Sequence, residues 1–257
     1  MILDNLEYIN VQKQVTDFPK HYHETFCISL IHKGIEQIEL ENQSIFSEKG
    51  CITITNPYEI HANPLIDNTS QVEFDTIYIS KDVMKYLFNG KNITFVNRKI
   101  NNKNANQLFR QLKNAIIIND IPTIENLLFQ FVATLKHYSQ EKKEEYSELN
   151  FNSLHNISSY IDNNISSKFC LDELSKVANL NKYGFAKKFK ASTGMTPMNY
   201  ILMKKIFSSK KLITKTTDLT QIAFDYEFSD LAHFSNTFKR YVGISPKIYQ
   251  KSISSIL

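Results

Sequence analysis

The sequence of 257 residues is 42% hydrophobic and 12% aromatic, which leaves room for two domains, each with its own core. No apolar run approaches the roughly 18–20 residues that span a bilayer. The N-terminus carries Asp4 and Glu7 without a basic region, so we expect no membrane partner, no secretory signal and a cytoplasmic location.

The formal net charge of +4 is unevenly distributed. Residues 168–251 hold 15 Lys and Arg against 6 Asp and Glu, whereas residues 1–167 hold 15 against 20. A basic module at one end predicts a partner with a phosphate backbone. A basic but merely solvated surface is the alternative explanation of the charge.

Residues 1–100 are predicted to form a β domain, with strands between residues 22 and 80. Apolar residues alternate at Phe26, Ile28 and Leu30, at Ile35, Ile38 and Leu40, at Ile52 and Ile54, and at Phe74, Ile77 and Ile79. Turn signals separate these stretches at Lys33-Gly34, Glu41-Asn42, Lys49-Gly50, Asn56-Pro57 and Asn63-Pro64. Short strands at regular spacing with turns between them indicate a sandwich or barrel.

The apolar period changes to that of a helix at about Asn104. One helix face holds Leu108, Leu112, Ala115 and Ile116, and a second face, holding Ile124, Leu127, Leu128, Phe131, Val132 and Leu135, follows the break at Ile121-Pro122. We therefore expect a helical hairpin over residues 101–139, packed on the β domain or on a second subunit. The charged residues 140–149 are assigned to a linker, and residues 150–257 to a C-terminal domain.

The C-terminal domain carries one pattern twice. Phe185, Phe189, Lys190, Gly194, Pro197 and Tyr200 recur 49 residues later as Phe234, Phe238, Lys239, Gly243, Pro246 and Tyr249. A matching apolar frame precedes each copy, Leu171, Leu174, Ala178 and Leu180 in the first and Leu219, Ile222, Tyr226 and Phe228 in the second. An internal repeat of this period indicates duplicated supersecondary units.

Each copy is predicted to be a helix-turn-helix, with a long helix from about Met198 to Ile213 between the copies. The second helix of such a unit enters the major groove of DNA. Because each phenylalanine pair anchors its helix to the core, the opposite face is predicted to contact DNA. That face holds Lys182, Tyr183, Ala186, Lys187 and Lys190 in the first copy and Leu231, Ala232, Ser235, Asn236 and Lys239 in the second.

Lysines neutralise phosphates or bind guanine, asparagine pairs with adenine, and alanine or leucine contacts a thymine methyl. We expect the lysine-rich first copy to grip DNA more strongly and the more neutral second copy to add discrimination. For any one of these residues, a plain surface role is the alternative.

The C-terminal stretch from about residue 150 to residue 251 resembles the DNA-binding domain of the AraC/XylS family of bacterial transcription regulators. The matching motifs are Leu171-Asp172-Glu173-Leu174, Gly194-Met195-Thr196-Pro197, Phe228-Ser229-Asp230, Phe238-Lys239-Arg240 and Gly243-Ile244-Ser245-Pro246. The resemblance implies two helix-turn-helix units in successive major grooves, roughly 34 Å apart on one face of the DNA.

Four positions depart from the family pattern. Glu227 stands where the second turn usually has glycine, and a left-handed backbone at a bulky residue costs roughly 1 kcal/mol or more. Gly184 lies within the first recognition helix, which it weakens by roughly 1 kcal/mol relative to alanine. Asn236 and Lys205 replace frequent arginines, so we expect a weaker hold on phosphate at these positions.

The N-terminal residues resemble the cupin-like sensor domain often fused to this DNA-binding module, through His21-Tyr22-His23, Gly34, Gly50, Asn56-Pro57 and His61. Three histidines suit a metal, but the glutamate that metal cupins carry after the second histidine is replaced by Cys27 and Ile28. We therefore expect no metal and no cofactor. The cysteines, Cys27, Cys51 and Cys170, are predicted to be reduced interior residues.

A small barrel holds one small ligand, so the resemblance implies an effector pocket. Its candidate residues are His21, His23, Phe26, Ile28, Ile54, His61 and Phe74, with plain core as the alternative for the four apolar ones.

The predicted fold class is α+β and multidomain, with a cupin-like β-barrel or jelly roll, a helical hairpin and an all-α domain with two helix-turn-helix units. The preferred interpretation is a sequence-specific transcription regulator that binds double-stranded DNA, responds to a small-molecule effector and is not an enzyme. We expect the chain to form a homodimer through the hairpin. As an activator, it is also expected to contact RNA polymerase. The alternatives are a metal-dependent cupin enzyme with a DNA-binding appendage and a DNA-binding protein without an effector.

Overall fold

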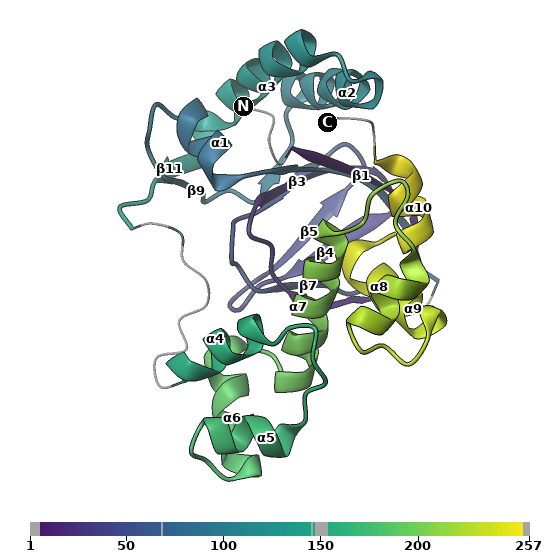
Figure 1. Ribbon diagram of the computed structural model, residues 1–257. Coiled ribbons are helices and arrows are strands. Elements are labelled where there is room, and N and C mark those ends of the chain that lie inside the picture. Colours follow the sequence, from purple (N-terminus) through teal and green to yellow (C-terminus); the bar gives the residue numbers. More distant parts are fainter. Residues whose placement is uncertain (1–5, 68, 145, 147–153, 254–257) are drawn as a thin grey trace. The chain divides into compact units, whose positions relative to one another are not determined.

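The computed structural model describes residues 6–67, 69–144, 146 and 154–253. By its internal contacts the chain divides into two compact units, the first formed mainly by Tyr22–Glu148 together with the strand-forming part of Met1–Asp17, and the second by Phe18–His21 and Leu149–Ile253. Strands dominate the first unit and helices the second (Figure 1). None of the described helices is long and apolar enough to cross a membrane.

The first unit is built on a five-stranded antiparallel sheet. Its strands, in spatial order, are β1 (Glu7–Gln14), β8 (Val72–Ile79), β3 (Phe26–Lys33), β6 (Ile52–Thr55) and β10 (Lys99–Ile100). Strand β3 lies at the centre, and its first six residues are all buried. A continuous buried run of this kind requires cover on both faces of the sheet.

A second group of strands contains β4 (Ile35–Glu39), β5 (Ser44–Glu48) and β7 (His61–Asn63), in which β4 pairs with both β5 and β7. Gly34 connects β3 to β4 with a φ of +77°, and a Cβ there would lie 2.1 Å from the carbonyl oxygen of Gln71. Only glycine fits this connection. In addition, β9 (Ile93–Phe95) pairs with β11 (Ser139–Glu141).

The described α-helices of this unit are α1 (Lys81–Leu87), α2 (Lys103–Ile118) and α3 (Ile121–Leu135), and a short 3-10 helix, η1 (Lys136–Tyr138), follows α3. Asn119, with a left-handed φ of 56°, ends α2, and Asp120 caps α3 by accepting from the backbone N–H of Thr123 at 3.3 Å. The predicted helical hairpin is thus present, with an Asn-Asp turn that both side chains suit.

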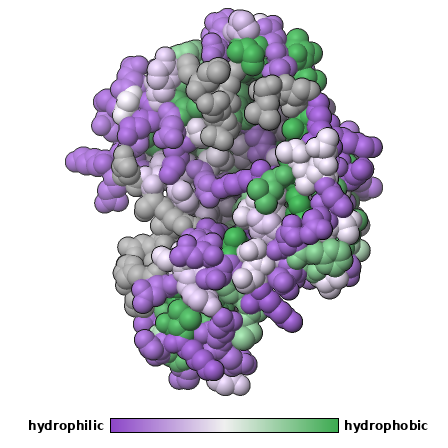
Figure 2. Space-filling model, in the orientation of Figure 1, coloured by the Kyte–Doolittle hydropathy of each residue, from purple (hydrophilic) through white to green (hydrophobic). Residues whose placement is uncertain are grey.

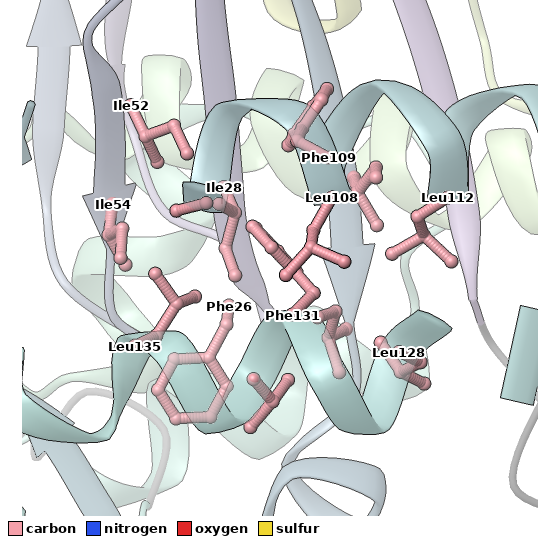
Figure 3. Close-up of a cluster of buried hydrophobic side chains, with 14 of the residues drawn as sticks. Phe26, Ile28, Ile52, Ile54, Leu108, Phe109, Leu112, Leu128, Phe131 and Leu135 are labelled. Atoms are coloured by element: carbon pink, nitrogen blue, oxygen red, sulfur yellow. The ribbon is translucent and has the colours of Figure 1, made fainter. Parts of the chain in front are cut away.

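The hairpin packs on one face of the five-stranded sheet, which is the first of the two locations expected for it. Phe26, Ile28, Ile52 and Ile54 of the sheet share a buried cluster with Leu108, Phe109, Leu112, Leu128, Phe131 and Leu135 of the helices (Figure 3). The contacts are aromatic as well as aliphatic, since the rings of Phe109 and Phe131 lie edge to face with centroids 5.8 Å apart.

A buried carboxylate also ties the hairpin to the sheet. Asp75 of β8 accepts hydrogen bonds from Lys113 of α2 at 2.7 Å and from His32, Tyr8 and Asn10 at 2.6–2.7 Å. Burial raises the pKa of Asp75, but these four donors outweigh burial and hold the pKa well below its ordinary value. The carboxylate therefore stays ionised inside the protein.

The second unit is helical apart from the short strand β2 (Phe18–His21). Its helices are α4 (His155–Asn163), α5 (Leu171–Val177), α6 (Lys182–Thr193), α7 (Pro197–Lys211), α8 (Leu219–Asp225), α9 (Leu231–Val242) and α10 (Pro246–Ser252). The predicted helix-turn-helix units correspond to α5–α6 and α8–α9, with α7 between them (Figure 1). On the face drawn in Figure 2, hydrophilic residues cover most of the region of α4–α6.

Several expectations need correction. The described strands form separate sheets and not a closed barrel, and the chain has strands at β1, β2 and β5 that apolar alternation did not predict. Gln140 and Glu141, assigned to a linker, pair with β9 as part of β11. Cys170 is exposed and caps α5 through its Sγ, whereas Cys27 and Cys51 are buried as expected.

Candidate DNA-binding and effector sites

The two turns between paired helices are built alike. Asn179 and Glu227 occupy equivalent positions after α5 and α8, with left-handed φ angles of 52° and 58°. The following N–H group closes each turn, from Leu180 to the carbonyl of Ser175 and from Phe228 to the carbonyl of Ala223, both at 2.9 Å. Glu227 thus adopts the left-handed backbone that its position implied, and the turn keeps the same shape as the first one.

The second helix of each unit starts and ends in matching ways. Asn181 caps α6 by accepting from the N–H of Gly184 at 2.8 Å, and Asp230 caps α9 by accepting from the N–H of His233 at 2.7 Å. Gly194 and Gly243 end the two helices in left-handed conformations. The repeated glycine of the sequence pattern is therefore a helix C-cap.

The repeated aromatic residues form the core beneath each second helix. Phe185 and Phe189 are fully buried, and Phe189 lies against Tyr200 with ring centroids 5.4 Å apart. In the second helix-turn-helix, Phe238 of α9 likewise lies against Tyr249, with ring centroids 5.6 Å apart. The repeated proline occupies the first turn of α7 and of α10, directly after a Thr or Ser cap.

With the phenylalanines buried, the opposite faces of α6 and α9 are free to meet solvent. None of the ten predicted DNA-contacting residues is buried: Lys182, Tyr183, Lys187, Lys190, Leu231, Ala232, Asn236 and Lys239 are exposed, and Ala186 and Ser235 are half-buried. Tyr183 is 86% exposed, which is unusual for an aromatic side chain without a partner surface. Lys182 also pairs with Asp172 at 3.0 Å.

The same two helices expose further polar residues that the sequence interpretation did not assign, namely Lys188, His233 and Arg240. Two of them could have been predicted: Lys188 follows Lys187 in a basic pair, and Arg240 belongs to the family motif Phe238-Lys239-Arg240. A Cβ on Gly184 would lie 3.2 Å from the capping oxygen of Asn181, which gives a local reason for glycine inside α6.

Lys205 has a different role from the phosphate contact expected of it. Its side chain is buried, and its Nζ donates to the carbonyl oxygens of Ser167 at 2.8 Å and Tyr226 at 2.7 Å. Burial lowers the pKa of this amine. Lys205 therefore connects the entrance of the first helix-turn-helix to the turn of the second.

In the first unit, the predicted effector residues divide between two faces of the sheet. Phe26, Ile28 and Ile54 lie in the cluster beneath the helical hairpin (Figure 3). Phe74 lies on the opposite face, because it is an odd number of residues from Ile77 and Ile79, which face the helices.

Two of the three predicted histidines lie together in the first unit. The rings of His23 and His61 have centroids 5.4 Å apart, whereas His21 belongs to the second unit. The Nδ1 atoms of His21 and His61 contact the carbonyl oxygens of Pro19 at 2.7 Å and Glu59 at 2.8 Å. Burial lowers the pKa of His61 and favours its neutral form. Neutral imidazoles of this kind can bind a metal ion or a polar ligand.

The sequence interpretation missed a set of buried polar residues on the strands. Glu36 is 3% exposed, whereas Ile35, counted among the apolar positions of its strand, is 45% exposed. A strict period of two, counted back from the buried Ile38, places Glu36 on the inner face. Glu36 accepts hydrogen bonds from Thr53 at 2.7 Å and Asn63 at 3.1 Å, and Asn63 in turn accepts one from Gln14 at 3.0 Å.

A strand-rich unit with buried polar residues, followed along the chain by two helix-turn-helix units with exposed polar faces, is the arrangement expected of a ligand-binding domain joined to a DNA-binding domain. Comparison with known families agrees, since residues 5–144 match an AraC-like ligand binding domain and residues 174–252 match a helix-turn-helix domain. The chain belongs to the AraC family of transcription regulators. It is a DNA-binding transcription regulator with an N-terminal ligand-binding domain, as the sequence predicted.

Individual proteins are similar over most of their length. The probable transcriptional regulator LumQ of Photobacterium leiognathi is 27% identical over 250 residues, which cover 90% of this chain and 91% of LumQ. The transcriptional activator RhaS of Citrobacter koseri is 20% identical over 93% of this chain and 90% of RhaS. Crystal structures of ToxT from Vibrio cholerae share the fold, apo with a TM-score of 0.56 and bound to an unsaturated fatty acid with a TM-score of 0.51. Both are 15% identical and cover at least 97% of each chain.

Proposed function

We propose that the regulator binds promoter DNA through the exposed faces of α6 and α9, one helix in each of two successive major grooves. The observation that carries this proposal is the matched construction of the two units, with the same turn, cap and aromatic anchor beneath each exposed face. Because both helices are anchored alike, their outward faces present equivalent positions to a groove.

Helix α7 sets the spacing between the two recognition helices, α6 and α9. Its 15 residues give a length of about 22 Å, and the segment of residues 212–218 adds to it before α8 begins. Successive major grooves on one face of DNA lie roughly 34 Å apart. We assign phosphate binding chiefly to α6, which exposes Lys182, Lys187 and Lys190, and base discrimination chiefly to α9, which exposes Asn236.

We further propose that a small effector bound by the first unit controls DNA binding. The predicted His23 and His61 lie together in this unit, and the buried polar residues around Glu36 offer hydrogen-bonding groups inside it. The likeness to ToxT, at 15% identity, concerns the fold alone. The effector of this chain must therefore be inferred from its own residues.

The relatives are named as transcription regulators, so we propose that the chain is not an enzyme and works in the cytoplasm, where bacterial DNA lies.

Exposed apolar residues on the hairpin, among them Ile117, Ile118 and Phe129, support a homodimer through this surface. RhaS is named an activator, which supports contact with RNA polymerase. Sedimentation of the purified chain as a monomer at all concentrations would contradict the dimer.

A footprint tests the DNA proposal. The full chain is mixed with DNA from upstream of its own gene and neighbouring genes, with and without cell extract, and the protected bases are mapped. We expect two protected segments separated by about one helical turn on one face of the DNA. A single short protected segment would contradict the use of both recognition helices. The same protection with and without cell extract would contradict control by an effector.

A further inference from the structure

Five polar side chains inside the first unit form what we call the interior polar cluster: Glu36, Ser47, Thr53, Thr55 and Asn63. Thr53 and Thr55 lie on the face of the five-stranded sheet opposite the helical hairpin, since they alternate with Ile52 and Ile54, which pack on the hairpin. Ser47 lies directly opposite Glu36 in the pairing of β4 with β5. In an antiparallel pair, such residues share one face.

Glu36 is the acidic member of this cluster, and no cation among the described side chains balances its ionised form. Each of its two carboxyl oxygens accepts one hydrogen bond, from neutral Thr53 and neutral Asn63. No described basic side chain pairs with it. Burial raises the pKa of Glu36 from its ordinary 4.5 to about 7, although the two hydrogen bonds oppose this change. Each oxygen retains a second lone pair that a further donor can use.

Two hydroxyl groups in the cluster have no partner among the described residues. The Oγ of Ser47 and the Oγ1 of Thr55 are both buried and make no hydrogen bond there. Ser47 is 0% exposed and Thr55 is 5% exposed. Burying a hydroxyl without a partner costs roughly 1–3 kcal/mol, and native proteins rarely leave such groups unsatisfied. Two of them near an unbalanced carboxyl point to a bound molecule.

The neighbouring titratable groups do not supply the missing positive charge. Lys99, opposite Thr53 in the pairing of β10 with β6, donates through its ammonium group to Glu48 and to the carbonyl oxygen of Phe46 instead. His61 lies two residues before Asn63 on β7, and its pKa is lowered by burial, so it is neutral near pH 7. Cys27, opposite Thr55 in the pairing of β3 with β6, carries no positive charge in any state. A neutral ligand would leave the carboxylate unbalanced, and an acidic ligand would add repulsion.

We propose that the interior polar cluster is the effector site and that its effector is a small cationic amine. The ammonium group donates to the free lone pairs of Glu36, and polar groups of the ligand bond to the hydroxyls of Ser47 and Thr55. This inference rests on the proposed control by an effector and names the chemical class of that effector.

The test uses the full chain and matched small molecules. Ethanolamine and putrescine are compared with their diol counterparts, ethylene glycol and butanediol, and with succinate, by thermal shift and by calorimetry. At least one amine raises the midpoint of unfolding by a few degrees, and its diol counterpart and succinate do not. Amine binding weakens about tenfold for each pH unit below the pKa of about 7 that burial gives Glu36, because the ammonium group requires the ionised carboxylate.

Glu36→Gln is the decisive variant, since it keeps the shape and removes the charge. It lowers amine affinity by about tenfold or more, whereas the control Glu39→Gln, on the exposed side of the same strand, leaves affinity unchanged. Absence of a shift with every amine, binding of the diols instead, or equal binding to Glu36→Gln would each overturn the proposal. The pH profile of the unaltered chain gives an independent readout if Glu36→Gln fails to fold.

A DNA-binding measurement on the same preparations distinguishes failure of the amine proposal from failure of the DNA-binding proposal. If the protein protects promoter DNA but binds no amine, the proposed effector class is wrong and the proposed DNA binding stands. If the protein protects no DNA, the proposed DNA-binding function is wrong.

Discussion

The carboxyl group of Glu36 is expected to shape how the stability of the protein depends on pH. Its pKa in the folded protein is about 7, above the ordinary 4.5, because burial disfavours the charged form. The folded state therefore binds more protons than the unfolded state between these values. The stability that Glu36 contributes is complete below about pH 4.5 and is lost as the pH rises through about 7.

Comparing the chain with Glu36→Gln isolates this effect from other titrations, such as that of His61. A displacement from 4.5 to about 7 corresponds to about 3 kcal/mol. We predict that the difference in free energy of unfolding between the two proteins shifts in favour of the variant by about this amount between about pH 5 and pH 8. Urea denaturation without ligand measures it, and a constant difference across this range would contradict a buried, uncompensated carboxyl.

Lys205 gives a second prediction at the level of one residue. Lys205→Met keeps the length of the buried side chain but leaves the carbonyls of Ser167 and Tyr226 without their donor. We expect a loss of about 1–3 kcal/mol in the stability of the helical unit, measured by urea denaturation and far-ultraviolet circular dichroism. The exposed Lys176→Met should change stability by less than about 0.5 kcal/mol. Equal effects of the two substitutions would show that the buried hydrogen bonds contribute nothing.

At the scale of elements, the two helix-turn-helix turns have one shape with different residues. Asparagine tolerates the left-handed backbone at Asn179, whereas glutamate does not tolerate it well at Glu227. We predict that Glu227→Gly stabilises the helical unit by up to about 1 kcal/mol, after the entropic cost of glycine is included. The matched Asn179→Gly should have little effect. A destabilised Glu227→Gly would mean that the glutamate side chain makes a favourable contact that outweighs the strain.

The helices were more predictable from the sequence than the strands, for physical reasons. The repeat identified the helix-turn-helix elements because the caps, the C-terminal glycines and the buried phenylalanines all depend on local spacing. Strand β5 was not predicted because four of its five residues are not buried, so it has no apolar face. The orientation of β4 was wrong because Ile35 is exposed while Glu36 is buried, contrary to their polarity.

The candidate sites show the same limit. Alternation identified two faces of the sheet, but it could not say which face the hairpin covers. Phe26, Ile28 and Ile54, for which the resemblance implied an effector pocket and plain core was the alternative, lie beneath α2 and α3. A resemblance, and not alternation, connected His23 with His61, whose rings lie 5.4 Å apart. That these histidines bind an effector stays a prediction.

At the scale of the whole molecule, the chain joins a ligand-binding domain to two DNA-reading units. The second unit is basic, with 15 Lys and Arg against 6 Asp and Glu over residues 168–251, and the first is mildly acidic. This division places the attraction for DNA on the reading units. It also allows an amine to bind in the first unit without a general excess of positive charge opposing it.

Whether the assigned faces of α6 and α9 read DNA can be tested through the affinity of four proteins for the footprinted fragment. Against the unaltered chain, Lys187→Ala should weaken binding to all sequences and lower the salt slope by about 1. Asn236→Ala should cost about 1–3 kcal/mol and relax the preference at one base pair. The control Lys103→Ala, at the start of α2, should bind as the unaltered chain does. Unchanged affinity for both Lys187→Ala and Asn236→Ala at fixed salt would contradict the account.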